Sequence, residues 1–185
     1  FYGKGVEKDA EKAVAYYTEA ANKGVVLAAS TLGDRYSYGE GVKKDFAEAV
    51  KWYAVAADAG NEWAQNKLAN CYYYGDGVEQ DEAKALEYFK KSAEAGNKNS
   101  MSRLGECYYY GRGTEQNYEE AFKWYQTAAE AGHNISKYSV GNCYFAGNGV
   151  EQNYEEAIKW FTEAAEQNIE GAMNKLGECY QYGYG

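Results

Sequence analysis

Hydrophobic positions recur along this chain with the spacing of one face of a helix, and polar positions lie between them. Residues 46–57 place apolar side chains at i, i+3, i+4, i+7 and i+8, which marks one face of an α-helix. Residues 63–74 show the same kind of spacing, so the pattern predicts two helices in succession. The expected buried stripes are Ala49, Trp52, Tyr53, Ala56 and Ala57 in the first helix, and Ala64, Leu68, Cys71 and Tyr72 in the second.

This two-helix unit recurs every 36 residues, and a Gly-x-Gly triplet marks each period without any insertion. Self-similarity at a fixed period of a few tens of residues is typical of repeat proteins. We therefore expect residues 1–185 to form a single array of about five repeats, with ten helical segments and no strands, cut from a longer chain. The glycine pairs are Gly3/Gly5, Gly39/Gly41, Gly75/Gly77, Gly111/Gly113, Gly147/Gly149 and Gly183/Gly185.

The boundaries of the first helix are also marked in every copy. An Asp or Asn precedes it as an N-cap, and in three copies a Glu follows three residues later, as in a capping box. A glycine suited to the left-handed conformation ends the helix in four copies, and Asn168 replaces it in the fifth. The caps are Asp9, Asp45, Asp81, Asn117 and Asn153, the glutamates are Glu48, Glu120 and Glu156, and the glycines are Gly24, Gly60, Gly96 and Gly132.

One position inside the second helix holds a small residue in every copy. Glycine occupies it four times out of five, although glycine in a helix interior costs about 1 kcal/mol relative to alanine. We infer that a neighbouring helix approaches closely there and that this contact is worth more than the cost. The column consists of Gly33, Ala69, Gly105, Gly141 and Gly177.

The repeat carries a specific motif, which one copy spells as Leu104-Gly105-x-x-Tyr108-x-x-Gly111-x-Gly113 and then Ala121-x-x-Trp124-Tyr125-x-x-Ala128-Ala129-x-x-Gly132. This motif resembles the Sel-one-like repeat, a relative of the tetratricopeptide repeat, and the resemblance covers essentially the whole chain. It implies an all-α fold, a right-handed α/α solenoid, that serves as a scaffold or adaptor. Catalytic members of that family are exceptions.

Composition and charge narrow the classes of function. The chain has no proline and 21 tyrosines, and 17% of its residues are aromatic, so it can bury enough surface to fold. A formal net charge of −9 disfavours nucleic acid as a partner, because nucleic-acid binders need a basic stripe. No apolar run approaches the roughly 20 residues that span a bilayer.

The four cysteines occur once per repeat, at Cys71, Cys107, Cys143 and Cys179. Helices pack about 8–10 Å apart, beyond the ~7 Å reach of a disulfide, and no C-x-x-C metal motif is present. We expect small, buried, free thiols, with redox sensing or intermolecular bridging as the alternatives. Relatives that form disulfides use two cysteines per repeat, so the resemblance favours a reducing, cytoplasmic compartment.

No other residue type forms a catalytic, metal-binding or cofactor-binding constellation. His133 is the one histidine and is expected in a solvated loop. The Gly-x-Gly triplets follow a helix and lack the third glycine of a dinucleotide site, so turn geometry explains them. The carboxylates are spread over predicted helix faces and are expected to be solvated.

The positions that the repeat leaves free predict where a partner binds. In tetratricopeptide units the inner helix of each pair lines a concave groove, and the helix ending at the glycine pair corresponds to it here. Columns 63, 66, 70, 73 and 74 should face this groove, and their Tyr, Trp and Asn side chains suit an extended peptide. Alternatively, the tyrosines of column 74 pack against the neighbouring turn. The predicted contact residues are Trp63, Asn66, Asn70, Tyr73, Asn99, Glu106, Tyr109, Tyr138, Asn142 and Phe145; column 74 holds Tyr38, Tyr74, Tyr110 and Tyr182.

The sequence therefore predicts a non-enzymatic scaffold that binds a protein or peptide in its concave groove. The main alternative is the regulatory or sensing arm of a larger enzyme or signalling protein, and a hydrolase is a remote one. Because both terminal repeats lack a cap, we also expect end-to-end self-association.

Overall fold

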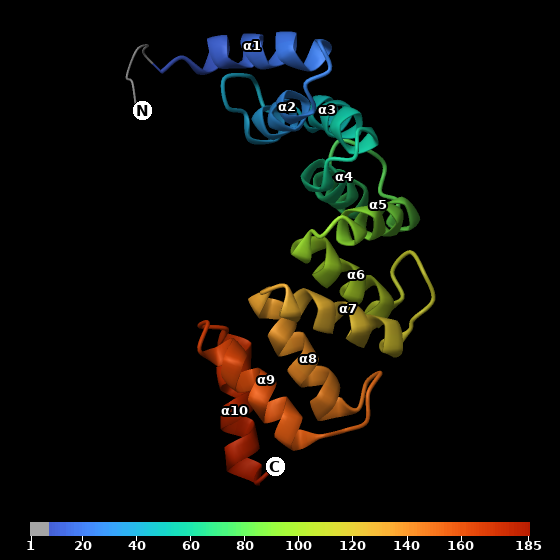
Figure 1. Cartoon of the computed structure of the whole chain (residues 1–185), viewed down its shortest axis with the longest axis vertical. Coiled ribbons are helices and arrows are strands. Elements are labelled where there is room, and N and C mark those ends of the chain that lie inside the picture. Colours follow the sequence, from blue (N-terminus) through green and yellow to red (C-terminus); the bar gives the residue numbers. More distant parts are fainter. Residues whose placement is uncertain (1–7) are drawn as a thin grey trace. The chain divides into compact units, whose positions relative to one another are not determined.

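The computed structural model describes residues 8–185, and the glycine pair Gly3/Gly5 lies outside this range. The described residues form ten α-helices of 12 or 13 residues and no strand, which confirms the predicted all-α repeats (Figure 1). The helices are α1 (Ala10–Asn22), α2 (Val26–Tyr38), α3 (Phe46–Asp58), α4 (Glu62–Tyr74), α5 (Glu82–Glu94), α6 (Lys98–Tyr110), α7 (Tyr118–Glu130), α8 (Asn134–Ala146), α9 (Tyr154–Ala165) and α10 (Glu170–Tyr182).

The chain divides into two compact units, Phe1–Tyr88 and Phe89–Gly185, with the boundary inside α5. In the first unit, α2 packs against α1 and α3, and α3 packs against α4. In the second unit, α6, α7, α8, α9 and α10 pack each against the next. Each unit is thus a succession of neighbouring helices, as the helical repeat solenoid predicted from the sequence requires.

The predicted N-caps are confirmed, but the capping box is only half formed. Asp45 Oδ1 accepts from the Glu48 N–H at 3.1 Å, as expected. The Glu48 side chain pairs with Lys51 instead of reaching back to the cap. The cap N–H is already satisfied, because it donates to a tyrosine carbonyl of the preceding helix. These bonds run from Asp45 to Tyr36, Asp81 to Tyr72, Asn117 to Tyr108 and Asn153 to Tyr144, at 2.8–2.9 Å.

The glycine pairs close each repeat for two separate reasons. The first glycine ends the second helix in the left-handed conformation, as at Gly39 with φ 74°. The second glycine lies directly against the first turn of the same repeat: a Cβ on Gly41 would collide with the Ala10 backbone, and one on Gly149 with the Tyr118 backbone. Only glycine fits the second position, so turn geometry accounts for the Gly-x-Gly motif.

Successive repeats meet where an aromatic ring covers the small position of the preceding helix. A Cβ on Gly33 would collide with the Tyr53 ring, and one on Gly105 would lie 2.7 Å from the Tyr125 ring. The Tyr53 ring is 1% exposed, so the close approach predicted from the small column is confirmed. Trp52, which was also expected in the buried stripe, is only half-buried.

The sequence predicted His133 in a solvated loop, and this prediction is wrong. His133 is the N-cap of α8, it is half-buried, and its Nδ1 accepts from the Ser136 N–H at 3.3 Å. Burial lowers the pKa of His133, and the nearby cations of Lys98 and Arg103 lower it further. The neutral imidazole is therefore the form that caps the helix. Asn61 and Asn97 cap the corresponding helices α4 and α6.

The column of small residues inside the second helices provides a matched pair of substitutions. Gly105→Ala should lower the free energy of unfolding by about 1–3 kcal/mol, because the buried Tyr125 ring must shift to admit the Cβ. Gly177→Ala should instead raise it, by up to about 1 kcal/mol, since no described atom lies within 4 Å of the added Cβ. Urea denaturation measures the change in the free energy of unfolding of each variant. Equal changes in the two variants would contradict the contact between the Tyr125 ring and Gly105.

The capping role of His133 predicts a pH dependence of stability. Because its pKa is lower in the folded state, its contribution is complete above the unfolded pKa of about 6.5 and is lost as pH falls through that value. His133→Asn keeps a cap that does not titrate. The variant should match wild type at pH 8 and gain stability relative to it at pH 5. Thermal melts at pH 8, 6.5 and 5 test this, and a constant difference in melting temperature would argue against it.

Candidate functional site

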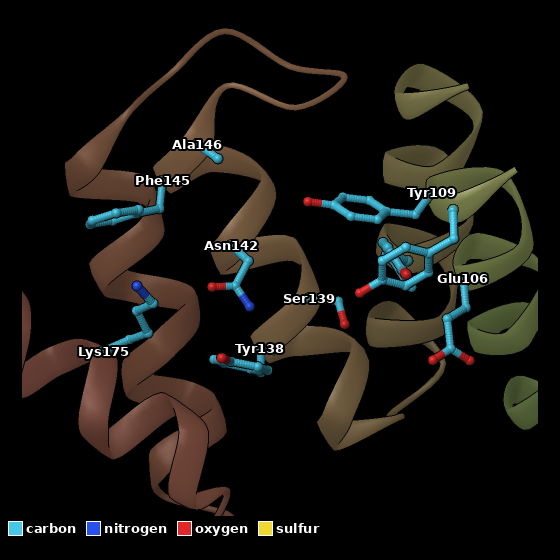
Figure 2. Close-up of a pocket in the computed structure, with 10 residues that line it drawn as sticks. Glu106, Tyr109, Tyr138, Ser139, Asn142, Phe145, Ala146 and Lys175 are labelled. Atoms are coloured by element: carbon cyan, nitrogen blue, oxygen red, sulfur yellow. The ribbon is translucent and has the colours of Figure 1, made fainter. Parts of the chain in front are cut away.

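The second unit contains a pocket of about 380 Å³. Its walls come from α6, α7, α8 and α10, so residues from three successive repeats meet there. Figure 2 shows Asn142 and Ser139 on α8 between Tyr109 and Glu106 on one side and Lys175 on the other. The lining residues are Glu106, Tyr109, Tyr110, Tyr125, Tyr138, Ser139, Asn142, Phe145, Ala146 and Lys175.

Half of the predicted contact residues line this pocket. They come from columns 66, 70 and 73 of the third and fourth repeats. The structure brings these columns together because α6 and α8 both pack against α7. The five residues are Glu106, Tyr109, Tyr138, Asn142 and Phe145.

The aromatic wall is held by packing against the following repeat. The Tyr109 ring lies 4.9 Å from the Tyr118 ring between centroids, and the Phe145 ring lies 5.2 Å from the Tyr154 ring. The Tyr109 hydroxyl also accepts from Asn148 Nδ2 at 2.8 Å, and burial raises the pKa of Tyr109. These rings are therefore oriented before any ligand arrives.

Two polar groups of the pocket have no hydrogen-bond partner among the described residues. The Tyr125 side chain is 6% exposed, yet its hydroxyl makes no such bond. Burial raises the pKa of Tyr125 far above its usual value, and the nearby Glu106 carboxylate raises it further, so the hydroxyl stays protonated and can donate. The Asn142 carboxamide likewise makes no hydrogen bond. Both groups offer hydrogen bonds to a ligand.

The charged groups at the two sides of the pocket are paired along their own helices. Glu106 accepts from Arg103 at 2.7 Å on α6. Lys175 donates to Glu178 at 2.7 Å on α10, and its ammonium lies 4.7 Å from the centroid of the Phe145 ring. The pocket is thus flanked by an acid on one side and a base on the other.

The predicted contact residues of the first unit are largely engaged with one another. Trp63 is 40% exposed, but its indole N–H donates to Asp34 at 3.3 Å. Asn70 donates to the Asn66 carbonyl at 2.7 Å. Asn66 and Tyr73 are each only 6% exposed, so both were wrongly expected to present their surface to a groove.

The burial of Tyr73 has a geometric reason. Column 73 faces the first helix of the following repeat, as the contacts of its counterparts Tyr109 and Phe145 show. Column 72, which was expected in the buried stripe, is only half-buried at Tyr72. Asn99 is exposed in the first turn of α6 and does not line the pocket.

Two residues that line the pocket were not predicted from the sequence. Tyr125 was named only as part of the repeat motif, because the position of its hydroxyl depends on how α7 packs. Lys175 belongs to a column that also holds Lys67 and Arg103. Because cations recur in this column, next to column 66 of the predicted groove, the sequence could have indicated Lys175 as a pocket residue.

The cysteines are free and buried, as predicted. Burial raises the pKa of Cys71 to about 11 and that of Cys143 to about 12. Within residues 8–185, no three His, Cys, Asp or Glu side chains are grouped so that they could hold a metal ion. No helix in the same range is both long and apolar enough to cross a membrane.

Comparison with known proteins gives a consistent result. The Sel1 repeat family model matches six consecutive segments: residues 1–25, 26–61, 64–97, 98–133, 135–169 and 171–185. No curated protein sequence matches the chain.

Solved structures extend this result. A protective antigen of uropathogenic Escherichia coli with an SLR fold is 38% identical, with a TM-score of 0.93 over 98% of this chain. A Sel1 repeat protein of Oxalobacter formigenes is 31% identical, with a TM-score of 0.87 over 92% of this chain and 70% of its own. An immunity protein of Pseudomonas aeruginosa, 22% identical over 91% of this chain and 62% of its own, shares the fold with a TM-score of 0.56. The chain spans 39% of the length of the E. coli antigen.

The raised thiol pKa values predict slow chemistry in the folded protein. At pH 8, Cys71 and Cys143 should react with a disulfide reagent on the order of a hundredfold more slowly than an exposed thiol, because the thiolate is the reactive form. All four cysteines should react after denaturation in guanidinium. Mass spectrometry of the labelled protein identifies each site, and rapid labelling of a native cysteine would count against its burial.

Proposed function

Because the chain belongs to the Sel1 repeat family, whose members are generally protein-interaction scaffolds, we propose that it is a non-enzymatic adaptor that binds an extended peptide segment in the pocket of the second unit. The Sel1 repeat fold is typically a non-catalytic scaffold. The partner is a protein with an accessible, extended segment.

The observation that carries this proposal is the pair of unpaired polar groups in the pocket. The Tyr125 hydroxyl has no partner among the described residues and belongs to a side chain that lines the pocket, so the site is suited to a ligand that supplies an acceptor. A peptide carbonyl can accept from Tyr125, and the Asn142 carboxamide can both donate to and accept from a peptide main chain. An extended segment offers such groups at every residue.

The walls of the pocket support the same class of ligand. Tyr109, Tyr138 and Phe145 provide apolar surface, and Tyr109 and Phe145 are fixed by packing against Tyr118 and Tyr154. Preoriented aromatic rings reduce the entropy lost on binding. The mixture of rings and amides is typical of surfaces that bind polypeptides.

Selection from a random dodecapeptide library against the whole chain tests this proposal. Tyr125→Phe removes only the hydroxyl and introduces the residue that Phe161 provides at the same repeat position. We expect this variant, and separately Asn142→Ala, to weaken the selected peptides roughly tenfold, as the loss of one buried hydrogen bond predicts. Titration calorimetry measures the change.

Asn70→Ala is the matched control, because Asn70 lies two repeats earlier in the same column and its amide is already bonded to Asn66. Its affinity for the peptides should stay within twofold of wild type, and circular dichroism should show all three variants folded. Failure to enrich any peptide, or unchanged affinity in both pocket variants, would show that this pocket is not a peptide site.

A further inference from the structure

The first unit contains a second copy of the pocket positions, 72 residues earlier, and there the chain fills the space with its own side chains. Five of the pocket positions hold the same residue or the same kind of side chain in both copies, and the other positions within the first unit differ. The pairs of the same kind are the carboxylates Asp34/Glu106, the aromatic pair Tyr73/Phe145 and the identical Tyr38/Tyr110, Tyr53/Tyr125 and Asn70/Asn142; the pairs that differ are Ser37/Tyr109, Asn66/Tyr138, Lys67/Ser139 and Tyr74/Ala146, and Trp63/Ile135 differs one turn before Lys67/Ser139.

In the first copy a cation lies between two aromatic rings, and one of these rings donates to a carboxylate. The Lys67 ammonium is 5.5 Å from the centroid of the Tyr38 ring and 4.6 Å from that of Trp63, and it donates to the Tyr38 hydroxyl at 3.2 Å. The Trp63 N–H donates to Asp34 at 3.3 Å. The Tyr53 hydroxyl donates to the same carboxylate at 2.7 Å. Every polar group named here is satisfied from within the unit.

In the second copy the cation and its indole platform are missing, while a tyrosine and a carboxylate near them are kept. Ser139 stands at the position of Lys67, and its hydroxyl turns back to the Ile135 carbonyl at 3.3 Å. Tyr110 is kept and is 58% exposed, and Glu106 is kept beside it in the pocket. The Tyr125 hydroxyl, unlike that of Tyr53, has no partner among the described residues. The space that Lys67 fills in the first copy is therefore part of the open pocket.

We propose that this pocket accepts a lysine or arginine side chain of the bound segment, whose cation takes the place that Lys67 holds in the first unit. The inference rests on the proposed function, since it specifies the chemistry of the peptide. A cation over the Tyr110 ring and next to Glu106 gains both a cation–π and a charge-assisted contact. The net charge of −9 favours the approach of a basic segment.

The other charged groups nearby leave room for this cation. Glu106 is bonded to Arg103 through one carboxylate oxygen, and a carboxylate has sites for further donors. The Arg112 guanidinium lies 5.4 Å from the centroid of the Tyr110 ring, which has a second face. Lys175 lines the opposite side of the pocket and is paired with Glu178 (Figure 2).

The test uses the peptides selected against the wild-type chain. Each selected peptide should contain a lysine or arginine, and replacing a lysine by norleucine, which removes only the ammonium, should weaken binding roughly tenfold. Glu106→Gln should weaken the lysine peptide by a similar factor and leave the norleucine peptide unchanged. Glu151→Gln, with the same change of charge at an exposed residue that does not line the pocket, should alter neither by more than twofold.

The second part of the experiment fills the pocket with a lysine side chain of the protein itself. Ser139→Lys reproduces the side chain of the first unit and should weaken the lysine peptide at least tenfold, whereas Ser139→Ala should not, with helical circular dichroism unchanged in both. Two results would overturn this inference and leave the proposed function standing. Either the peptides that depend on Tyr125 and Asn142 carry no basic residue, or their affinity does not depend on Glu106. The absence of any binding peptide would overturn both.

Discussion

The structure depends on one recurring contact, in which an aromatic ring of the first helix of a repeat lies on a glycine of the helix before it. Tyr53 on Gly33, Tyr125 on Gly105 and Phe161 on Gly141 are three copies of this contact. A Cβ at any of these glycines would fall under 3 Å from the ring, so a larger residue would push the two helices apart. The cost of a glycine within a helix is offset because the large ring becomes buried.

The same contact positions the candidate site. Because the Tyr125 ring rests on Gly105, its hydroxyl reaches the pocket beside Glu106, which is one residue further along α6. The residue that stacks two repeats is therefore also the most buried of the side chains that line the pocket. Stacking and binding are linked through a single side chain, and substitution of the hydroxyl alone separates them.

Repetition makes the two pocket copies directly comparable. The backbone positions recur, so the difference between a filled and an open pocket lies in a few side chains. Trp63 and Lys67 fill the first copy through contacts with Asp34 and Tyr38. In the second copy the smaller Ser139 lines an open pocket at the position of Lys67. A repeat array can thus keep one fold while individual repeats gain or lose a binding site.

The sequence by itself determined the features that depend on local or periodic chemistry: the helices, the caps such as Asp45, the closing glycines, the small column and the free thiols. These follow from spacing along one chain and from residue types with narrow conformational roles. Only the tertiary structure decided that Tyr73 is buried and that His133 caps α8. It also brought Tyr125 and Lys175 into one pocket, because side chains 50 residues apart meet only after the rotation of each packed helix is set by its neighbours.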